Sequence, residues 1–229
     1  MRLLTQEQLA KMIDQTELSP CITDDALQQH CEKSKAYGFK TVAINNACIT
    51  KCKEYLGNSD VLIDAAISFP LGQCSLDTKL FETKDAIAKG AKEVDYVINI
   101  GELKNGNYLY IEKEMQAIVE ICKNANVVSK VIFENCYLTD DEKRKLCEIA
   151  LKVKPNYIKT STGFGTGGAT VEDVQLMKSM VGDEIKIKAS GGVRSLEQAM
   201  AMIEAGASRI GTSKGIQIMD EYIEVNNNM

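Results

Sequence analysis

The sequence has little of what metal sites and disulfide frameworks require. It contains one histidine, His30, and its eight cysteines include no Cys-x-x-Cys pair. Cys48 and Cys52 are four residues apart, which is half of a metal-binding pattern, but a single histidine in a polar stretch does not complete it. We therefore expect no metal ion and no other cofactor. Reduced thiols, as in a cytoplasmic protein, are the expected state of the cysteines.

Long apolar runs and basic clusters are also absent. No apolar stretch approaches the roughly 20 residues that cross a membrane, and residues 1–6 lack the apolar block of a signal peptide. The 27 basic and 32 acidic side chains give a net charge of −5. These observations argue against membrane and nucleic-acid partners, and they agree with a cytoplasmic location.

Short apolar segments do recur along the chain, and each is followed by a segment of helical type. Strands are expected at residues 13–16, 41–45, 61–67, 93–100, 127–134, 156–159, 185–189 and 208–211. Helices are expected at residues 24–37, 47–56, 76–89, 108–124, 139–153, 171–181 and 195–206, and a short last helix opens at 212–215. Residues 226–229 are expected to fray.

The alternation of strands and helices predicts a parallel sheet. Eight such units without a linker predict a (β/α)8 TIM barrel, an α/β fold, as a single domain over residues 1–229. An open doubly wound sheet is the alternative. That fold usually carries a G-x-G-x-x-G fingerprint after an early strand, and the fingerprint is missing.

Charged residues at strand ends indicate where the chemistry lies. Lys159 ends a strand, and burial of its stem would disfavour the ammonium form, leaving an amine that can attack a carbonyl. Lys188 ends the next strand at the same height, so each ammonium would disfavour the other. Asp95 lies among apolar neighbours and could move a proton. The trio predicts metal-free aldol chemistry; a buried Lys–Asp salt bridge is the alternative, and it leaves one lysine unpaired.

Glycine-rich loops follow the last two strands. They are Ser190-Gly191-Gly192-Val193-Arg194 and Gly211-Thr212-Ser213. In barrels of this type, phosphate is usually bound here by backbone N–H groups and a helix N-terminus. The alternative is that the glycines serve only tight turns. Two adjacent loops favour phosphate.

Taken together, these motifs resemble the deoxyribose-phosphate aldolase family of class I aldolases, which are (β/α)8 barrels. The resemblance runs from about residue 13 to 215. It rests on the segments SFPLG (68–72), EVDYVINIG (93–101), KTSTGFG (159–165), KASGGVR (188–194) and RIGTS (209–213). It implies a lyase that reversibly cleaves 2-deoxy-D-ribose 5-phosphate to D-glyceraldehyde 3-phosphate and acetaldehyde, in deoxyribonucleotide and carbohydrate catabolism.

The resemblance also implies roles for individual residues. Lys159 would form the imine, Lys188 would perturb it and help to transfer protons, and Asp95 would move protons at the imine carbon and the sugar hydroxyl. The implied substrate-binding residues are Asp14, Thr16 and Thr162 near the sugar hydroxyls, and Gly163, Gly191, Gly192, Val193, Arg194, Gly211 and Ser213 in the phosphate site. A homodimer is left open.

The chain departs from the family pattern near the first two strands. Gln15 replaces the histidine of Asp-His-Thr, and Ala43 and Asn46 replace residues of Val-Cys-Val-Asn-Pro. These changes predict altered barrel packing or substrate fit. Lys186 shares the parity of Lys188, but the sequence leaves open whether it points into the barrel one layer lower, where it would need a carboxylate partner such as Asp64.

Two other functions remain open at this point. The first is a barrel that binds a sugar phosphate and regulates another protein, which would not need the two lysines. The second is a different Schiff-base aldolase, such as a transaldolase, that acts on a larger phosphorylated ketose. Acetaldehyde as donor would separate the second from the family activity.

Overall fold

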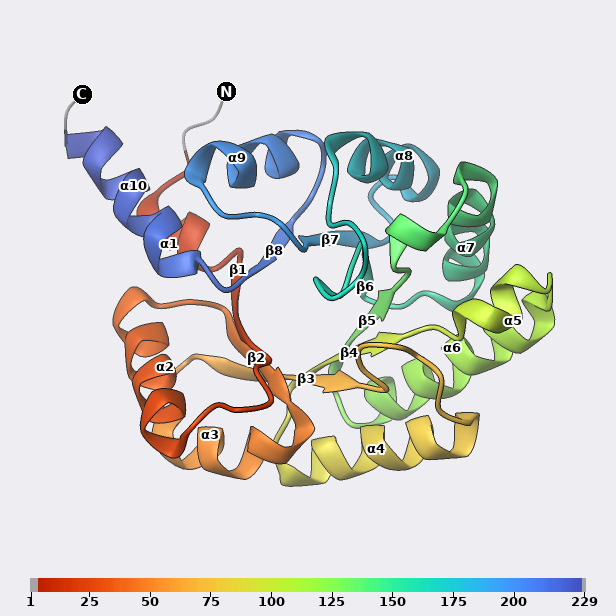
Figure 1. Cartoon of the computed structure of the whole chain (residues 1–229), viewed down its shortest axis with the longest axis horizontal. Helices are drawn as coiled ribbons and strands as arrows, with labels where there is room; N and C mark the ends of the chain where they lie inside the picture. The colour runs from red at the N-terminus through yellow and green to blue at the C-terminus, as the bar shows by residue number, and fades with distance from the viewer. Residues whose placement is uncertain (1–3, 228–229) are drawn as a thin grey trace.

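The computed structural model describes residues 4–227, which form a closed barrel of eight parallel strands surrounded by helices (Figure 1). The strands are β1 Ile13–Glu17, β2 Thr41–Asn45, β3 Leu62–Ile67, β4 Glu93–Val97, β5 Val128–Ile132, β6 Tyr157–Lys159, β7 Lys186–Ser190 and β8 Arg209–Thr212. Each strand pairs with the next, and β8 closes on β1 with Ile210 opposite Ile13. The predicted TIM barrel is confirmed.

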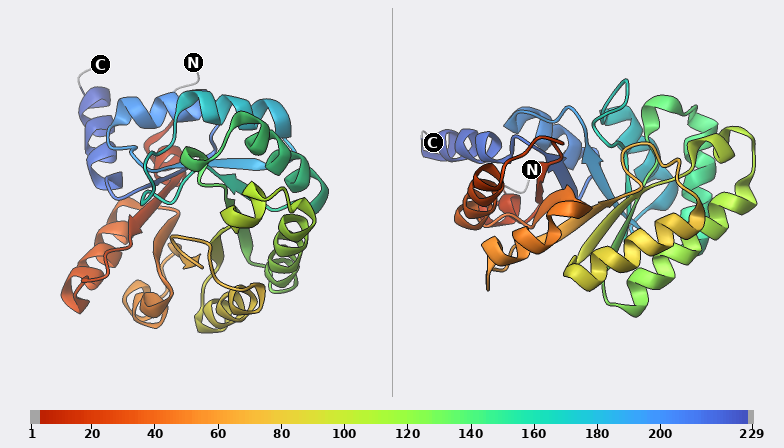
Figure 2. Two further views of the ribbon diagram at one scale, coloured as in Figure 1. Left: turned by 45° about the vertical axis from the view of Figure 1, so that its right-hand side comes forward. Right: turned by 60° about the horizontal axis from the view of Figure 1, so that its bottom comes forward.

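The helices form a layer outside the strands (Figure 2). They are α1 Gln6–Ala10, α2 Asp24–Tyr37, α3 Ile49–Leu56, α4 Leu76–Lys89, α5 Ile100–Lys104, α6 Tyr108–Asn124, α7 Asp140–Val153, α8 Val171–Val181, α9 Leu196–Glu204 and α10 Gly215–Asn227, with 3-10 turns η1 Asn46–Cys48 and η2 Asn135–Tyr137. None of the described helices is both long enough and apolar enough to cross a membrane.

The apolar core lies between the strands and the helices. Outward-facing Val94 and Tyr96 of β4 are fully buried in one cluster with Ile111 and Ile118 of α6. Because side chains alternate along a strand, the residues between them point into the barrel. Asp95 is one of these inward residues, so the barrel interior carries charge while the core outside it is apolar.

The end of β4 differs from the prediction. A strand over residues 93–100 was expected, but β4 ends at Val97 and α5 follows almost at once. The reason is Asn99, whose side-chain oxygen accepts a hydrogen bond from Glu102 N at 3.1 Å and caps α5. Asp95 therefore lies nearer to the end of its strand than the sequence indicated.

The C-terminal helix is also longer than the sequence predicted. The expected short helix is α10, which has 13 residues and includes Asn226 and Asn227. Residues 228 and 229, and the outer limits of the predicted domain at 1 and 229, lie outside the described residues. α10 lies beside α1 (Figure 1), where the Tyr222 hydroxyl donates to the backbone oxygen of Leu4.

A buried ion pair outside the barrel holds the end of β4 in place. Lys79 Nζ is 2.7 Å from Glu114 Oε1 and donates to Val97 O at 2.7 Å, and both side chains are fully buried. Glu114 Oε2 accepts from Asn99 N at 3.0 Å. The pair thus links α4, α6 and the segment that follows Asp95.

We expect Glu114→Gln to lower the free energy of unfolding by about 3 kcal/mol, because it leaves the Lys79 charge buried without a partner. Denaturant unfolding followed by circular dichroism measures the loss. Glu120→Gln, an exposed glutamate on the same helix, is the control and should change stability by less than about 0.5 kcal/mol. Equal effects of the two substitutions would contradict this account.

Candidate active site

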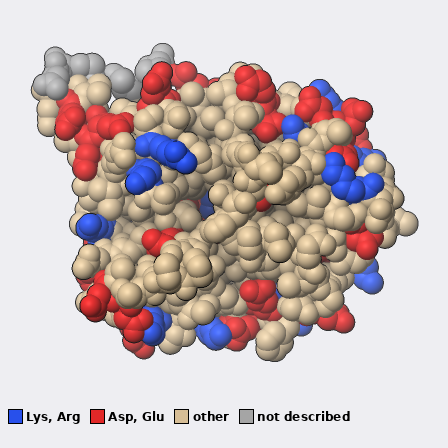
Figure 3. All heavy atoms as spheres, viewed as in Figure 1, with Lys and Arg blue, Asp and Glu red and all other residues tan. Residues whose placement is uncertain are grey.

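A cavity of about 400 Å³ opens at the C-terminal ends of the strands. Lys159, Asp95 and Asp64 lie at its floor, and the loops after β6, β7 and β8 form one side of it. Figure 3 shows a hollow close to the loop between β6 and α8. This is the end of the barrel at which chemistry is expected in the fold.

The structure brings the two lysines and the aspartate together. Lys159 Nζ and Lys188 Nζ each lie 2.6 Å from the same oxygen, Asp95 Oδ2. The strand register explains this, since Lys159 is paired with Lys188 across β6 and β7. Lys159 is 5% exposed, and Lys188 is fully buried. Only Lys159 of the two lines the cavity.

The surroundings shift the pKa values of the two lysines in opposite directions. Burial lowers the pKa of Lys159, and the Lys188 ammonium lowers it further, while Asp95 opposes both. For Lys188, burial also favours a lower pKa, but Asp14, Asp64 and Asp95 outweigh it and raise the pKa above its usual value. Lys159 is therefore the better nucleophile, and Lys188 stays an ammonium.

A second layer of charges lies under this trio. Lys130 Nζ is 2.8 Å from Asp64 Oδ2, 2.7 Å from Glu93 Oε2 and 2.8 Å from Asp95 Oδ1. Arg209 Nη1 lies 2.8 Å from Glu93 Oε2. We call the connected set the barrel ion cluster; its members are Asp14, Asp64, Glu93, Asp95, Lys130, Lys159, Lys188 and Arg209.

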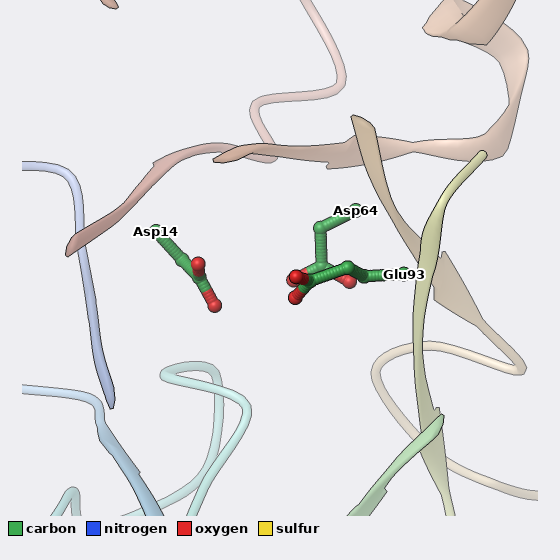
Figure 4. Close-up of side chains that lie close together, drawn as sticks. All are labelled: Asp14, Asp64 and Glu93. Atoms are coloured by element: carbon green, nitrogen blue, oxygen red, sulfur yellow. The ribbon is translucent and has the colours of Figure 1, made fainter. Parts of the chain in front are cut away.

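Three carboxylates of the cluster have the spacing of a metal site. Oxygens of Asp14, Asp64 and Glu93 lie within 4.8 Å of one another (Figure 4). Protein cations already contact these groups, since Lys130 Nζ is 2.8 Å from Asp64 and 2.7 Å from Glu93, and Arg209 Nη1 is 2.7 Å from Asp14. The triad thus has lysine and arginine as counter-ions, and the absence of a metal cofactor stays a prediction.

The loops after β7 and β8 offer backbone donors to the cavity. The N–H groups of Gly192, Val193 and Ser213 have no backbone acceptor within residues 4–227. Gly191 and Gly192 have φ values of 83° and 82°. A Cβ built on Gly192 would meet nothing within 4 Å, so open space lies there. Free N–H groups around open space suit an anion.

The other predicted residues of the phosphate side also line the cavity. Gly163 has a φ of 89°, and exposed Arg194 lies at the edge. Gly211 has a second role, because a Cβ there would lie 3.0 Å from Lys188 Cε and 2.9 Å from Ser190 Cβ. The missing side chain of Gly211 therefore makes room for the lysine stem.

Glu134, at the end of β5, holds the loop after Lys159. Its carboxylate accepts from Thr162 N at 3.1 Å and from the Thr162 hydroxyl, and the same hydroxyl accepts from Phe164 N at 3.0 Å. Phe164 packs edge-on against Phe69 with centroids 5.6 Å apart, and the Phe69 ring lies 5.9 Å from Lys159 Nζ. Thr162 thus lines the cavity beside an apolar wall.

On the β1 side, Thr16 lines the cavity but Asp14 does not. Asp14 was expected beside a sugar hydroxyl, yet its side chain is fully buried below the floor. Its carboxylate contacts Arg209 at 2.7 Å, Lys188 at 2.6 Å and the Thr41 hydroxyl at 2.8 Å. These partners draw it downward, so Asp14 acts on Lys188 rather than facing the cavity.

The comparison with known proteins agrees with this geometry. A family model described as DeoC/LacD family aldolase matches residues 8–220. The chain belongs to this family. It is 53% identical over 214 residues to the deoxyribose-phosphate aldolase of Lactobacillus acidophilus, covering 93% of this chain and 90% of that protein.

Solved structures of aldolases match it throughout. "QR15, an Aldolase" has a TM-score of 0.91 at 36% identity and covers 96% of this chain and 98% of its own. The deoxyribose phosphate aldolase from Aeropyrum pernix, described as a unique tetrameric structure, has a TM-score of 0.88 at 31% identity and covers 98% of this chain and 94% of its own.

The departures from the family motifs have visible consequences. Gln15 points away from the barrel interior, where its Nε2 donates to Ser213 O at 3.3 Å and its Oε1 accepts from Gly215 N at 3.0 Å. Ala43 lines the cavity, and Asn46 begins η1. Gln15 thus affects the packing of the β8 loop, while Ala43 affects the space for substrate.

The position of Lys186 in β7 answers the question that the sequence left open. Lys186 is exposed at the opposite mouth of the barrel because it is the first residue of β7, and its Nζ lies 5.7 Å from the Tyr157 ring centroid. Asp64 instead contacts Lys130 and Lys188, at 2.8 and 2.9 Å. No buried carboxylate is therefore needed for Lys186.

Sequence reasoning missed Lys130, Glu93, Arg209 and Glu134. Each is a charged residue at the end of, or inside, an otherwise apolar strand segment, and each is nearly or fully buried. Lys130 in the run VVSKVIFE carried the same signal that identified Asp95. A charge within a strand of a barrel was therefore the available clue.

We expect Lys188→Leu to raise the pKa of Lys159, because a cationic neighbour is lost while Asp95 remains. Each unit of increase in this pKa lowers the fraction of neutral Lys159 amine about tenfold at neutral pH. Borohydride trapping with acetaldehyde should slow at neutral pH and recover at higher pH, with the label on Lys159. Lys186→Leu, an exposed lysine of the same strand, is the control. A label on the peptide of Lys188 in wild type, or an unchanged pH dependence in Lys188→Leu, would contradict this assignment of roles.

Proposed function

We propose that the protein is a class I aldolase that reversibly cleaves 2-deoxy-D-ribose 5-phosphate to D-glyceraldehyde 3-phosphate and acetaldehyde. The observation that carries this proposal is Lys159, a buried amine whose pKa is lowered chiefly by burial, on the floor of an open cavity. Membership in the aldolase family supports it. The Lactobacillus acidophilus relative bears the name of this activity.

The reaction begins when the Lys159 amine attacks the aldehyde carbon, C1, of the open-chain sugar. Loss of water leaves a protonated imine. Removal of the proton from the C3 hydroxyl then breaks the C2–C3 bond, and the electron pair moves into the imine to form an enamine. Glyceraldehyde 3-phosphate leaves. Protonation of the enamine carbon and addition of water release acetaldehyde and restore the Lys159 amine.

Asp95 is the group placed to move protons in these steps, directly or through one water. Burial raises the pKa of Asp95, but Lys130, Lys159 and Lys188 outweigh it and hold the pKa well below its usual value. The carboxylate is therefore ionised when the positive imine forms beside it. Lys188 keeps the carboxylate ionised and contacts it at 2.6 Å, so it can pass a proton to Asp95.

The phosphate group would lie against the loops after β7 and β8. Gly192, Val193 and Ser213 line this region and have N–H groups without a backbone acceptor within residues 4–227, and Arg194 adds a positive charge at its edge. Thr16 and Thr162 would contact sugar hydroxyls from the other walls. This arrangement separates the charged end of the substrate from the aldehyde end at Lys159.

We also propose a cytoplasmic homo-oligomer that acts in deoxyribonucleotide catabolism. All eight cysteines, which lie within the described residues, are free, and this favours a reducing compartment. The Aeropyrum pernix relative is described as tetrameric. A homodimer is the simplest assembly to test, by light scattering of the purified chain.

Lys159→Leu should abolish cleavage while the protein still folds, because leucine fills the space of the buried stem but cannot form an imine. The measurement is turnover of deoxyribose 5-phosphate, with mass spectrometry after acetaldehyde and borohydride to detect the adduct. Residual activity within about tenfold of wild type, a barrier change of only 1.4 kcal/mol, would count against the assignment. Lys214→Leu, an exposed lysine next to the cavity, should retain both activity and adduct.

Gly192→Asn should weaken binding of phosphorylated substrate by filling the open space beside the free N–H groups. We expect KM for deoxyribose 5-phosphate to rise at least about tenfold, equal to 1.4 kcal/mol, with little effect on unphosphorylated deoxyribose. Gly38→Asn is the matched control, since Gly38 also has a positive φ and open space around it but caps α2. Equal losses for both sugars would make the loop only structural.

A further inference from the structure

The barrel ion cluster has a charge balance that depends on the state of Lys159. Among the described residues it joins four carboxylates, one from β1, one from β3 and two from β4, to four basic groups on β5, β6, β7 and β8. When all four carboxylates are ionised, these charges cancel only if Lys159 is a cation. An imine-forming lysine must be neutral when it attacks and positive once the imine forms. A buried cluster that gains and loses a unit charge would be costly.

Asp64 is the carboxylate whose negative charge is stabilised least by its neighbours. Its contacts are the ammonium groups of Lys130 at 2.8 Å and Lys188 at 2.9 Å, and both lysines are shared with other carboxylates. Glu93 has both oxygens bound by Arg209, at 2.8 and 3.4 Å. Asp95 contacts three lysines. Burial and the Asp95 charge raise the pKa of Asp64 above its usual range.

Asp14 is the remaining carboxylate, and it differs from Asp64 in its partners. It accepts from Arg209 at 2.7 Å and from the Thr41 hydroxyl at 2.8 Å, in addition to its contact with Lys188 at 2.6 Å. Although burial raises its pKa, Lys188, Arg209 and Lys130 lower the pKa of Asp14 below its usual range. A proton added to the cluster therefore goes to Asp64.

We propose that Asp64 carries, in the resting enzyme, the proton that Lys159 lacks. The amine then forms by proton transfer within the protein rather than by loss of a proton to solvent. This inference rests on the proposed Schiff base at Lys159. Asp64 acts through Lys188 and Asp95 and does not touch the imine, so it is a positioning residue that holds a proton.

The contacts provide a continuous path for this transfer. Lys159 Nζ gives a proton to Asp95 Oδ2 across 2.6 Å, and Lys188 Nζ lies 2.6 Å from the same oxygen and 2.9 Å from Asp64 Oδ2. Lys188 gives a proton to Asp64 and takes one from Asp95. The net change converts the Lys159 ammonium and the Asp64 carboxylate into an amine and a carboxylic acid.

The stored proton is used when the imine forms. Attack of the amine on an aldehyde gives a neutral carbinolamine, whose hydroxyl must take up a proton before it leaves as water. Asp64 returns its proton along the same path, water departs, and a protonated imine remains opposite an Asp64 carboxylate. The departing water carries away one proton from the amine and one from Asp64, so no proton is drawn from solvent, and the charges of the cluster cancel at the start and at the end.

Proton uptake during imine formation tests the proposal. Wild-type protein mixed with acetaldehyde in weakly buffered solution with an indicator dye should take up close to zero protons per adduct, counted by mass after borohydride reduction. In Asp64→Asn the cluster is balanced with neutral Lys159, so each adduct should take up about one proton from solvent. Adduct formation should also become slower as pH rises between about 6 and 8, whereas in wild type it should stay nearly flat.

The control is Asp173→Asn, which removes a carboxylate from an ion pair with Lys143 at 2.6 Å, outside the barrel. It should match wild type in proton uptake and pH dependence. The same uptake in Asp64→Asn and wild type would overturn the role of Asp64. A wild-type protein that forms no acetaldehyde adduct would instead refute the proposed function.

Infrared spectroscopy of the wild-type protein gives a second test, which does not depend on whether a variant folds. The resting protein should show the carbonyl band of one protonated carboxyl group, and that band should disappear when acetaldehyde is bound. A resting spectrum without the band, in a protein that still forms the adduct, would overturn the proposal.

Discussion

The contact on which the site depends is the Asp95 oxygen shared by two lysines. One carboxylate oxygen lies 2.6 Å from both Lys159 and Lys188, which sets the two amines close enough to influence each other. Taken alone, that geometry would leave two equivalent lysines. Asp14 and Asp64 break the equivalence because they contact Lys188 and not Lys159. The chemistry of Lys159, which lines the cavity, is thus determined by carboxylates that contact its neighbour Lys188.

A closed barrel makes this arrangement possible at acceptable cost. Inward-facing residues from all strands meet along one axis, so charges far apart in sequence compensate each other by direct contact. The apolar core lies outside the strands, where Tyr96 and Ile158 pack against helices. Stability and reactivity are therefore separated: the outer shell supplies the hydrophobic burial, and the interior can carry an ionic cluster that would be costly elsewhere.

Much of this was predictable, for identifiable reasons. The eight strand–helix units follow from periodicity, and the meeting of Lys159 and Lys188 follows from equal positions at the ends of consecutive strands. The deep burial of Asp14 was not foreseen, because one strand does not reveal that Arg209 and Thr41 contact its carboxylate, and its role at a sugar hydroxyl stays a prediction. The end of β4 was misjudged because apolar residues continue past Asn99. The Asn99 side chain caps α5, and the helix therefore begins where the strand was expected to continue. Lys130 was overlooked although its strand context was as unusual as that of Asp95.

Closure of the barrel also has a consequence for how the protein is made. The Gln15 side chain bonds Ser213 and Gly215, and the second of these contacts spans 200 positions of the chain. The loop proposed to select phosphorylated sugars is thus held by the first strand and is synthesised after the strand that carries Lys159. We expect a nascent chain to contain its nucleophilic lysine well before it can discriminate among aldehydes. Substrate choice is in this sense acquired later in synthesis than the nucleophile.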